Sequence, residues 1–144
     1  MAVTSFFRAE ALTTESKTNF IREVWDRLER IPGGDGYSRV TLADRRAVRN
    51  HLSCVHAVAL ANLVELTGNV ALGYSLPDDA RFIVAGMGLD YIKKARGTIT
   101  GECRIPPIDS SAKQEYQINV TLRDEAGDVV VEGTLRTLVG PKEL

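Results

Sequence analysis

The spacing of hydrophobic positions changes along the chain and predicts helices in the first half and strands in the second. From Phe20, apolar side chains recur at every fourth residue, which predicts an amphipathic helix from Thr14 to Arg30. From about Val55 to Leu72 nearly every position is apolar, so this segment is interpreted as a helix enclosed by protein on most sides. One helix is therefore expected on a surface and the other in the core.

Five further segments have the pattern of strands. Apolar and polar residues alternate strictly in Gly97–Ile105 and Tyr116–Leu122, which is typical of strands with one buried face. Phe82–Ile92 and Val129–Val139 are further candidates, and Tyr37–Leu42 is a shorter one. The connections between the last four segments are too short for crossover helices, so these strands are expected to be antiparallel.

This order of elements predicts an α+β fold in which an antiparallel sheet curls around one apolar helix. Asp124–Asp128 is predicted to form a hairpin turn, with Gly127 at the position that needs a positive φ. Residues 1–36 are interpreted as an N-terminal segment that carries the amphipathic helix, with residues 1–12 peripheral. Residues 37–144 are interpreted as the main domain.

Composition narrows the classes of function. The 18 basic and 19 acidic residues leave a net charge of −1, which argues against a surface dedicated to nucleic acid. An uninterrupted apolar stretch of about 18 residues is not recognised, so no membrane insertion is expected. The first residues lack the long apolar core of a signal peptide, and the two cysteines suit a reducing compartment. A cytoplasmic location is therefore expected.

Glu65 stands in the middle of the enclosed helix, where an ionised carboxylate is costly unless it is paired, solvated or used in chemistry. Asn62 and Asn69 lie three residues before it and four residues after it, on the same helix face, and could orient it or a water molecule. A purely structural carboxylate, satisfied by backbone or by Asn62, is the alternative interpretation.

A polar loop that contains Asn50, His51, Cys54 and His56 directly precedes the helix. Three of these residues also have a structural interpretation: Asn50 can turn the chain, Cys54 can fill space, and His56 can fix the loop by bonding to backbone. Together with Glu65 they lack the paired spacing of a metal site, so no metal is expected.

Three motifs resemble those of PaaI-type acyl-CoA thioesterases, which have the hotdog fold, a curved antiparallel sheet wrapped around a central helix. The run NHLSCVHAV at residues 50–58, followed by Glu65, is similar to their Asn…His-Gly-Gly…Asp/Glu pattern. The run LDYIKKARG at residues 89–97 resembles their Tyr-Leu-x-Pro-Ala-x-x-Gly strand motif, and VEGT at residues 131–134 resembles their terminal strand. The predicted N-terminal helix matches a poorly characterised branch of thioesterase-like proteins.

The resemblance implies roles for four residues. Glu65 takes the position of the catalytic carboxylate, as general base or nucleophile, and Asn50 takes that of the loop amide. Ala57 takes the position of the glycine whose backbone N–H points at the thioester carbonyl, and His56 is the histidine before it. This chain departs from the pattern in two places: His-Gly-Gly is His-Ala-Val, and Val84 stands where some relatives carry a strand hydroxyl.

The resemblance also implies the substrate and the assembly. The substrate would be an acyl-CoA or another acyl thioester, with coenzyme A as part of the substrate and no further cofactor required. The chain would form a homodimer or homotetramer, with Asn50 and Ala57 of one chain facing Glu65 of its neighbour. Candidate ligands for the CoA phosphates are Lys93, Lys94 and Arg96, with Arg45, Arg46 and Arg49 as a second possibility. A solvated strand end is the alternative interpretation of the first group.

Two other functions remain open at this point. A hotdog dehydratase or hydratase could use His51 and Glu65, although the phenylalanine and prolines that follow the histidine of that family are missing here. A non-catalytic acyl-CoA binding protein would explain the altered glycine motif and the valine at position 84.

Overall fold

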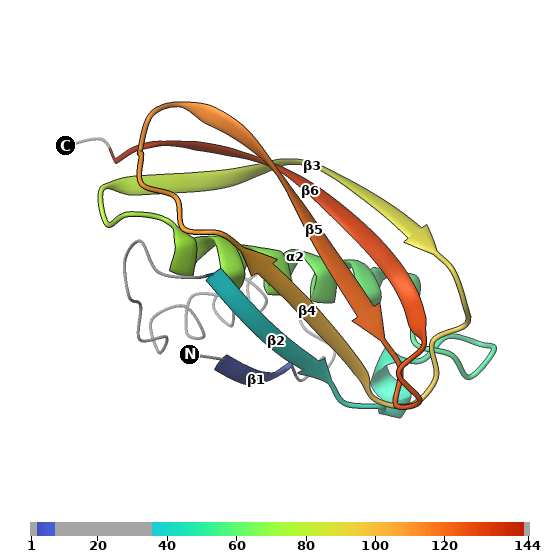
Figure 1. Ribbon diagram of the computed structural model, residues 1–144. Coiled ribbons are helices and arrows are strands. Elements are labelled where there is room, and N and C mark those ends of the chain that lie inside the picture. Colours follow the sequence, from blue (N-terminus) through green and yellow to red (C-terminus); the bar gives the residue numbers. More distant parts are fainter. Residues whose placement is uncertain (1–2, 8–35, 143–144) are drawn as a thin grey trace.

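The computed structural model describes residues 3–7 and 36–142, and in this part of the chain a curved sheet lies against one long helix (Figure 1). In chain order the elements are β1 Val3–Phe7, β2 Gly36–Leu42, the 3-10 helix η1 Arg46–Val48, α2 Ala57–Ser75, β3 Ala80–Tyr91, β4 Ile99–Ile105, β5 Gln114–Arg123 and β6 Val129–Pro141. The predicted α+β class, with antiparallel strands curved around a central apolar helix, is confirmed. The predicted helix at Thr14–Arg30 lies outside the described residues.

The strands follow the order β1-β2-β4-β5-β6-β3 across the sheet. The pairs β4–β5 and β5–β6 are antiparallel, as predicted for consecutive strands with short connections. The pairs β2–β4 and β6–β3 are antiparallel too, and β3 lies beside β6 and not beside β4, the next strand along the chain. Residues 1–12 were expected to be peripheral, and within them Val3–Phe7 forms an edge strand that pairs parallel with β2. At the opposite edge, β3 has β6 as its one neighbour among the described strands.

The first residues of β4 and α2 differ from their predicted positions. β4 begins at Ile99 and not at Gly97, because Gly97 has φ +76°, which is incompatible with an extended strand. α2 begins at Ala57 and not at Val55, because the Val55 N–H donates to the Ala95 carbonyl and keeps that residue extended. The Asp124–Asp128 turn forms as predicted, with Gly127 at φ +86°.

α2 also continues past its predicted end near Gly73. It runs to Ser75 and ends at Leu76, whose extended backbone is the conformation favoured for a residue before proline. Gly73 is buried inside the helix, so its contacts there outweigh the helix-breaking tendency of glycine.

The resulting 19-residue helix changes one expectation from the sequence. By length and composition α2 could cross a membrane, whereas the sequence had been interpreted as having no such stretch. Of its most apolar 18-residue window, 61% is buried inside the protein. A mostly buried core helix can have the same length and composition as a membrane-spanning helix. Its length is therefore weak grounds for a membrane span.

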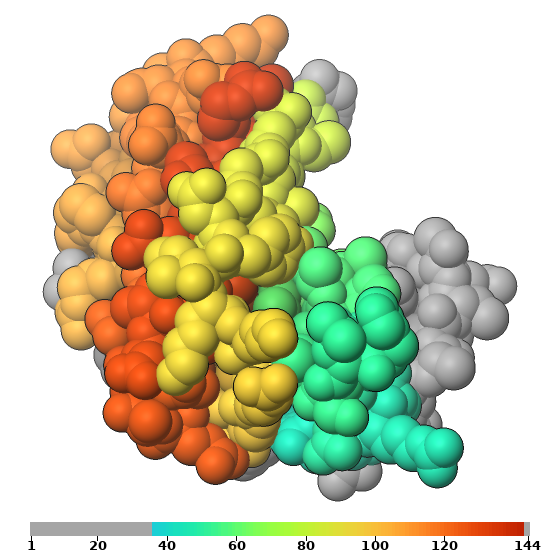
Figure 2. Space-filling model, turned by 90° about the vertical axis from the view of Figure 1, so that its right-hand side faces the viewer, coloured from blue at the N-terminus to red at the C-terminus, as the bar shows by residue number. Residues whose placement is uncertain are grey.

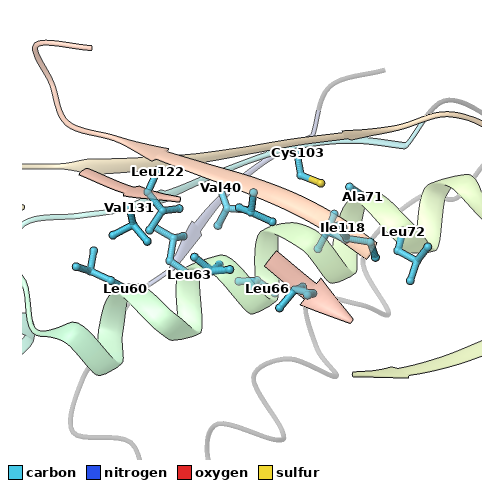
Figure 3. Packing of buried hydrophobic residues seen from close by; sticks show 14 of the residues in the cluster. Val40, Leu60, Leu63, Leu66, Ala71, Leu72, Cys103, Ile118, Leu122 and Val131 are labelled. Atoms are coloured by element: carbon cyan, nitrogen blue, oxygen red, sulfur yellow. The ribbon is translucent and has the colours of Figure 1, made fainter. Parts of the chain in front are cut away.

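The core fills the concave side of the sheet (Figure 3). Leu60 and Leu63 of α2 are buried beside Leu122 of β5 and Val131 of β6, and burial of one such side chain stabilises the fold by about 1.5–3 kcal/mol. Helix and sheet approach closely at four glycines, where an added Cβ would lie within 2.5 Å of a neighbouring side chain: Gly36, Gly68, Gly101 and Gly133.

Candidate active site

A cavity of about 380 Å³ lies at the amino end of α2. Asn50 and Ala57 line it from the loop and the helix start, and Tyr91 and Lys94 line it from the end of β3 and the segment after it. In Figure 2 the green start of α2 and the yellow β3 segment form adjacent surfaces. The structure therefore brings together two of the four predicted catalytic residues, which are seven positions apart in the sequence.

Hydrogen bonds fix the orientation of the Asn50 side chain. Its Oδ1 accepts the backbone N–H groups of Leu52 and Cys54, at 2.9 and 3.1 Å. Ser53 adopts φ 57°, a left-handed conformation that closes this tight turn. In the described part of the chain the Nδ2 amide has no acceptor, so Asn50 both turns the loop and keeps a donor available at the cavity.

The start of α2 is held by His56, which is its N-cap residue. His56 Nδ1 accepts the Val58 N–H at 3.1 Å, and the His56 N–H donates to the Val48 carbonyl at 2.7 Å. His56 therefore fixes the loop by bonding to backbone, as its structural interpretation required. Within residues 3–7 and 36–142 no acceptor engages the Ala57 N–H, which stays available at the positive end of the helix dipole.

Glu65 is half-buried, and α2 is less enclosed than its sequence suggested. It shares a stripe with half-buried Asn62 and Asn69 and exposed Val58, on the side turned away from the core. Among the described residues no hydrogen bond or ion pair satisfies the Glu65 carboxylate, and the Asn69 Oδ1 is buried without a partner. The structural alternative, in which backbone or Asn62 satisfies Glu65, therefore has no support in this part of the chain.

Glu65 does not line the cavity that contains Asn50 and Ala57. Eight residues separate Ala57 from Glu65 along α2, which corresponds to about 12 Å of helix. The predicted catalytic residues of one chain therefore occupy two places, a cavity at the helix start and a half-buried position two turns further on.

The two cysteines are free and buried. Cys54 lines the cavity and its thiol donates to the Leu52 carbonyl at 3.5 Å, which fits the predicted role as a filler. Burial raises the pKa of the Cys103 thiol to about 12, so it stays a neutral thiol at physiological pH. Residues 3–7 and 36–142 contain no cluster of three or more His, Cys, Asp or Glu side chains that could hold a metal ion.

The three cations predicted to bind phosphate differ in their surroundings. Lys93 Nζ bonds to Asp124 Oδ2 at 2.9 Å and to Asp128 Oδ2 at 2.8 Å, so it ties the end of β3 to the β5–β6 turn. Lys94 and Arg96 are exposed and have no ion-pair partner in the described part of the chain. In the second basic group, Arg49 is held by both oxygens of Asp44, whose pKa this hydrogen bonding lowers.

Replacing Lys93 with methionine is expected to lower thermal stability slightly between about pH 4 and pH 10. The hydrogen bond from Lys93 holds the pKa of Asp124 below its usual 3.8, so this stabilisation is complete above that value and is lost as the pH falls through the lowered pKa. The hydrogen bonds to Asp128 and Asp124 raise the pKa of Lys93 above 10.5, so the stabilisation is also lost as the pH rises through that raised value.

Thermal melts of the wild type and the variant across this pH range would measure the effect. Lys113→Met is the matched control, because Lys113 is exposed and has no ion-pair partner among the described residues. A melting-temperature difference that persists unchanged at pH 2–3 would show that the aspartate pairs are not its cause.

Tyr91 is a residue of this site that was not predicted from the sequence. Tyr91 was noted as part of the strand motif but was given no role, yet it lines the cavity and its hydroxyl donates to the Ala57 carbonyl at 3.1 Å. A tyrosine at the end of a strand leading to the Lys93-Lys94 pair was the available signal. His51, in contrast, is exposed and does not line the cavity.

One protein-family model matches most of this chain. The family described as "Domain of unknown function (DUF4442)" matches residues 13–139. The chain belongs to the DUF4442 family. No curated protein shows significant similarity to it.

Solved structures show the fold of this DUF4442 protein. A Pseudomonas aeruginosa protein of unknown function, described as a "Probable Thioesterase", is 27% identical, with a TM-score of 0.72 over 90% of this chain and 91% of that one. A thioesterase from Haemophilus influenzae is 15% identical, with a TM-score of 0.66 over 92% and 93% of the two chains. A Bacillus halodurans protein crystallised with CoA is 22% identical, with a TM-score of 0.60 over 70% and 66%. The DUF4442 chain has the hotdog fold that was predicted from its motifs.

Proposed function

We propose that this DUF4442 protein hydrolyses acyl-CoA thioesters. The observation that carries the proposal is the cavity at the start of α2, where Asn50 and Ala57 present two donors that are not engaged within the described residues. The likeness to a probable thioesterase and to a protein crystallised with CoA supports the same reaction class and substrate.

The two donors suit the charge that develops during thioester hydrolysis. When water attacks the carbonyl carbon, negative charge moves to the carbonyl oxygen, and preorganised N–H donors stabilise that oxygen most in the transition state. The Ala57 N–H, aided by the dipole of the 19-residue helix, is the proposed main donor. The Asn50 Nδ2 is the proposed second donor, to the same oxygen or to the attacking water.

Glu65 is the proposed general base or nucleophile, supplied by a second copy of the chain. As a base it would take the proton from the water that attacks the thioester, and the C–S bond then breaks to release CoA. As a nucleophile it would attack the carbonyl carbon, displace the CoA thiolate and form an anhydride with the acyl group, which water then hydrolyses. The separation of about 12 Å along α2 keeps Glu65 away from the Ala57 of its own chain. A homo-oligomer in which each cavity receives Glu65 from a neighbour would bring the two groups together.

The β3 edge is the proposed contact between copies. β3 is 12 residues long and has one neighbour among the described strands, so its outer edge presents unpaired backbone groups. Three large apolar side chains of this strand are also unusually exposed: Ile83 at 68%, Met87 at 43% and Tyr91 at 50%. A long, apolar edge of this kind favours association with another strand.

Replacing Lys94 with alanine is expected to raise KM for acyl-CoA about two- to five-fold with little change in kcat. Lys94 lines the cavity and is exposed, so its ammonium can reach a CoA phosphate, whereas Lys93 is occupied by two aspartates. Steady-state kinetics with a single acyl-CoA would measure the change. Lys113→Ala is the control, because Lys113 does not line the cavity. Equal KM values for both variants would show that Lys94 does not bind a CoA phosphate.

The direct test is a panel of acyl-CoAs of different chain length, with release of free CoA thiol as the measurement. Wild-type protein is expected to turn over at least one member, and Asn50→Ala to be slower on the same substrate. A folded protein that turns over no member of the panel would contradict the proposal. Crotonyl-CoA belongs in the panel, because its hydration would reveal the dehydratase-type alternative that uses His51.

A non-catalytic acyl-CoA binding protein is the second candidate. Val84 is half-buried and has no hydroxyl to hold a water molecule, and this observation favours binding without hydrolysis. Calorimetric binding of a non-hydrolysable acyl-CoA analogue, without turnover of any ester, would select this candidate. The cytoplasmic location stays a prediction from the sequence.

A further inference from the structure

One peptide group at the cavity is held from both ends. The peptide between Ala57 and Val58 has its carbonyl bonded by the Tyr91 hydroxyl at 3.1 Å and its N–H bonded by His56 Nδ1 at 3.1 Å. Tyr91 comes from the end of β3, 34 residues away, and His56 comes from the loop before the helix. Both walls of the cavity therefore converge on the same backbone unit.

The hydrogen bond from Tyr91 is not needed to satisfy the backbone. A carbonyl in the first turn of an α-helix already accepts the N–H four residues later, so the hydroxyl is an additional donor. The Tyr91 side chain is 50% exposed, so burial alone does not explain its position. What the bond does determine is the orientation of the first helical turn relative to β3.

That orientation decides where the Ala57 N–H points. Because the peptide on the carboxyl side of Ala57 is held, rotation of the first turn is restricted, and so is the direction of the N–H of Ala57, a residue that lines the cavity. The hydrogen bond from the Val58 N–H also identifies the tautomer of His56. Because Nδ1 accepts this hydrogen bond, the ring N–H must be on Nε2. His56 and Tyr91 thus form a clamp on the residue that donates to the substrate.

We propose that Tyr91 is a positioning residue for thioester hydrolysis, which acts through the Ala57–Val58 peptide and aims the Ala57 N–H at the substrate carbonyl. This inference rests on the proposed function. Tyr91 does not transfer a proton in this scheme and does not contact the reacting atoms. Tyr91 would stabilise the transition state more than the ground state, because the orientation of an N–H donor matters most when negative charge develops on the carbonyl oxygen.

The test compares Tyr91→Phe with Tyr116→Phe in the full-length protein. Both substitutions remove one hydroxyl from a strand tyrosine, and the Tyr116 hydroxyl bonds only to the Gln114 side chain among the described residues. Tyr91→Phe is expected to lower kcat about three- to ten-fold, with KM within about two-fold and an unchanged melting temperature. Tyr116→Phe is expected to match the wild type in all three. An unchanged kcat for Tyr91→Phe, or a loss confined to KM, would overturn the proposal.

A second measurement separates this proposal from the proposed function. The amide resonances of Ala57 and Val58 in NMR spectra are expected to shift, and their hydrogen exchange to accelerate, in Tyr91→Phe but not in Tyr116→Phe. If the wild type hydrolyses no acyl-CoA but these amides respond, the proposed function fails and the clamp stands as structure only. If the wild type is active and the amides do not respond, the clamp itself is refuted.

Discussion

Replacing Glu65 with glutamine is expected to reduce kcat for acyl-CoA hydrolysis by about 10²–10⁴-fold. Glutamine keeps the size and the hydrogen-bonding reach of the side chain but can neither accept the proton of water nor attack a thioester. The carboxylate has no hydrogen-bond or ion-pair partner within residues 3–7 and 36–142, so its removal is expected to leave stability nearly unchanged. Steady-state kinetics and a thermal melt on the same preparation would measure both effects.

Glu102→Gln is the matched control for this experiment. Glu102 is an exposed glutamate on β4, on the side of the sheet away from α2. Its Oε1 lies 3.8 Å from Arg39 Nε. Its substitution is expected to change neither kcat nor KM by more than about two-fold. Turnover by Glu65→Gln close to that of the wild type would show that Glu65 is neither base nor nucleophile.

Mixing two variants of reduced activity tests whether the site spans two chains. If Asn50 and Ala57 of one chain act with Glu65 of its neighbour, a mixed dimer of Glu65→Gln and Asn50→Ala contains one intact site. Random reassociation of equal amounts is then expected to restore about a quarter of wild-type activity, because half of the dimers are mixed and each has one of two sites. Activity that stays at the level of the separate variants would place the whole site within one chain.

Replacing Gly133 with alanine is expected to cost about 1–3 kcal/mol of unfolding free energy. A Cβ at this position would lie 2.5 Å from Val64 Cγ1, 3.0 Å from its Cγ2 and 3.3 Å from a Leu89 methyl carbon. Val64 is fully buried, so it can yield only by moving α2 away from the sheet. Chemical denaturation would measure the loss.

Gly88→Ala is the matched control, because Gly88 lies on the neighbouring strand β3 and an added Cβ there meets nothing within 4 Å. It is expected to be neutral or slightly stabilising, since alanine restricts the unfolded chain more than glycine does. Equal losses for the two substitutions would mean that backbone flexibility, and not the closeness of helix and sheet, explains the Gly133 result.

The local pattern of the sequence predicted the elements well. β5 and β6 lie within two residues of their predicted bounds. For β5 the reason is its alternation over seven positions, which is a strong signal of a half-buried strand. The errors lie where a contact overrides the pattern. Val55 looked helical by composition, but its backbone bonds to Ala95, forty residues away. Gly73 looked like a helix end, but it is buried within the helix.

The candidate site was predicted in part. Asn50 and Ala57, whose roles were implied by the resemblance, line one cavity because a tight turn connects them. The sequence did not indicate that two aspartates hold the Lys93 ammonium. The position of Tyr91 before the Lys93-Lys94 pair could have marked it as a residue of the site, but its contact with the helix start joins residues 34 positions apart and does not follow from the sequence pattern.

The sequence by itself determined the secondary structure, the curled α+β architecture and the family motif around Asn50, His56 and Glu65, because these depend on spacing between near neighbours along the chain. Only the tertiary structure decided which polar groups are engaged in hydrogen bonds or ion pairs and which have no such partner among the described residues. The bonds of Lys93 and Tyr91 join residues 31 to 35 positions apart. Such contacts form when the strands and the helix pack together, and short-range spacing does not reveal them.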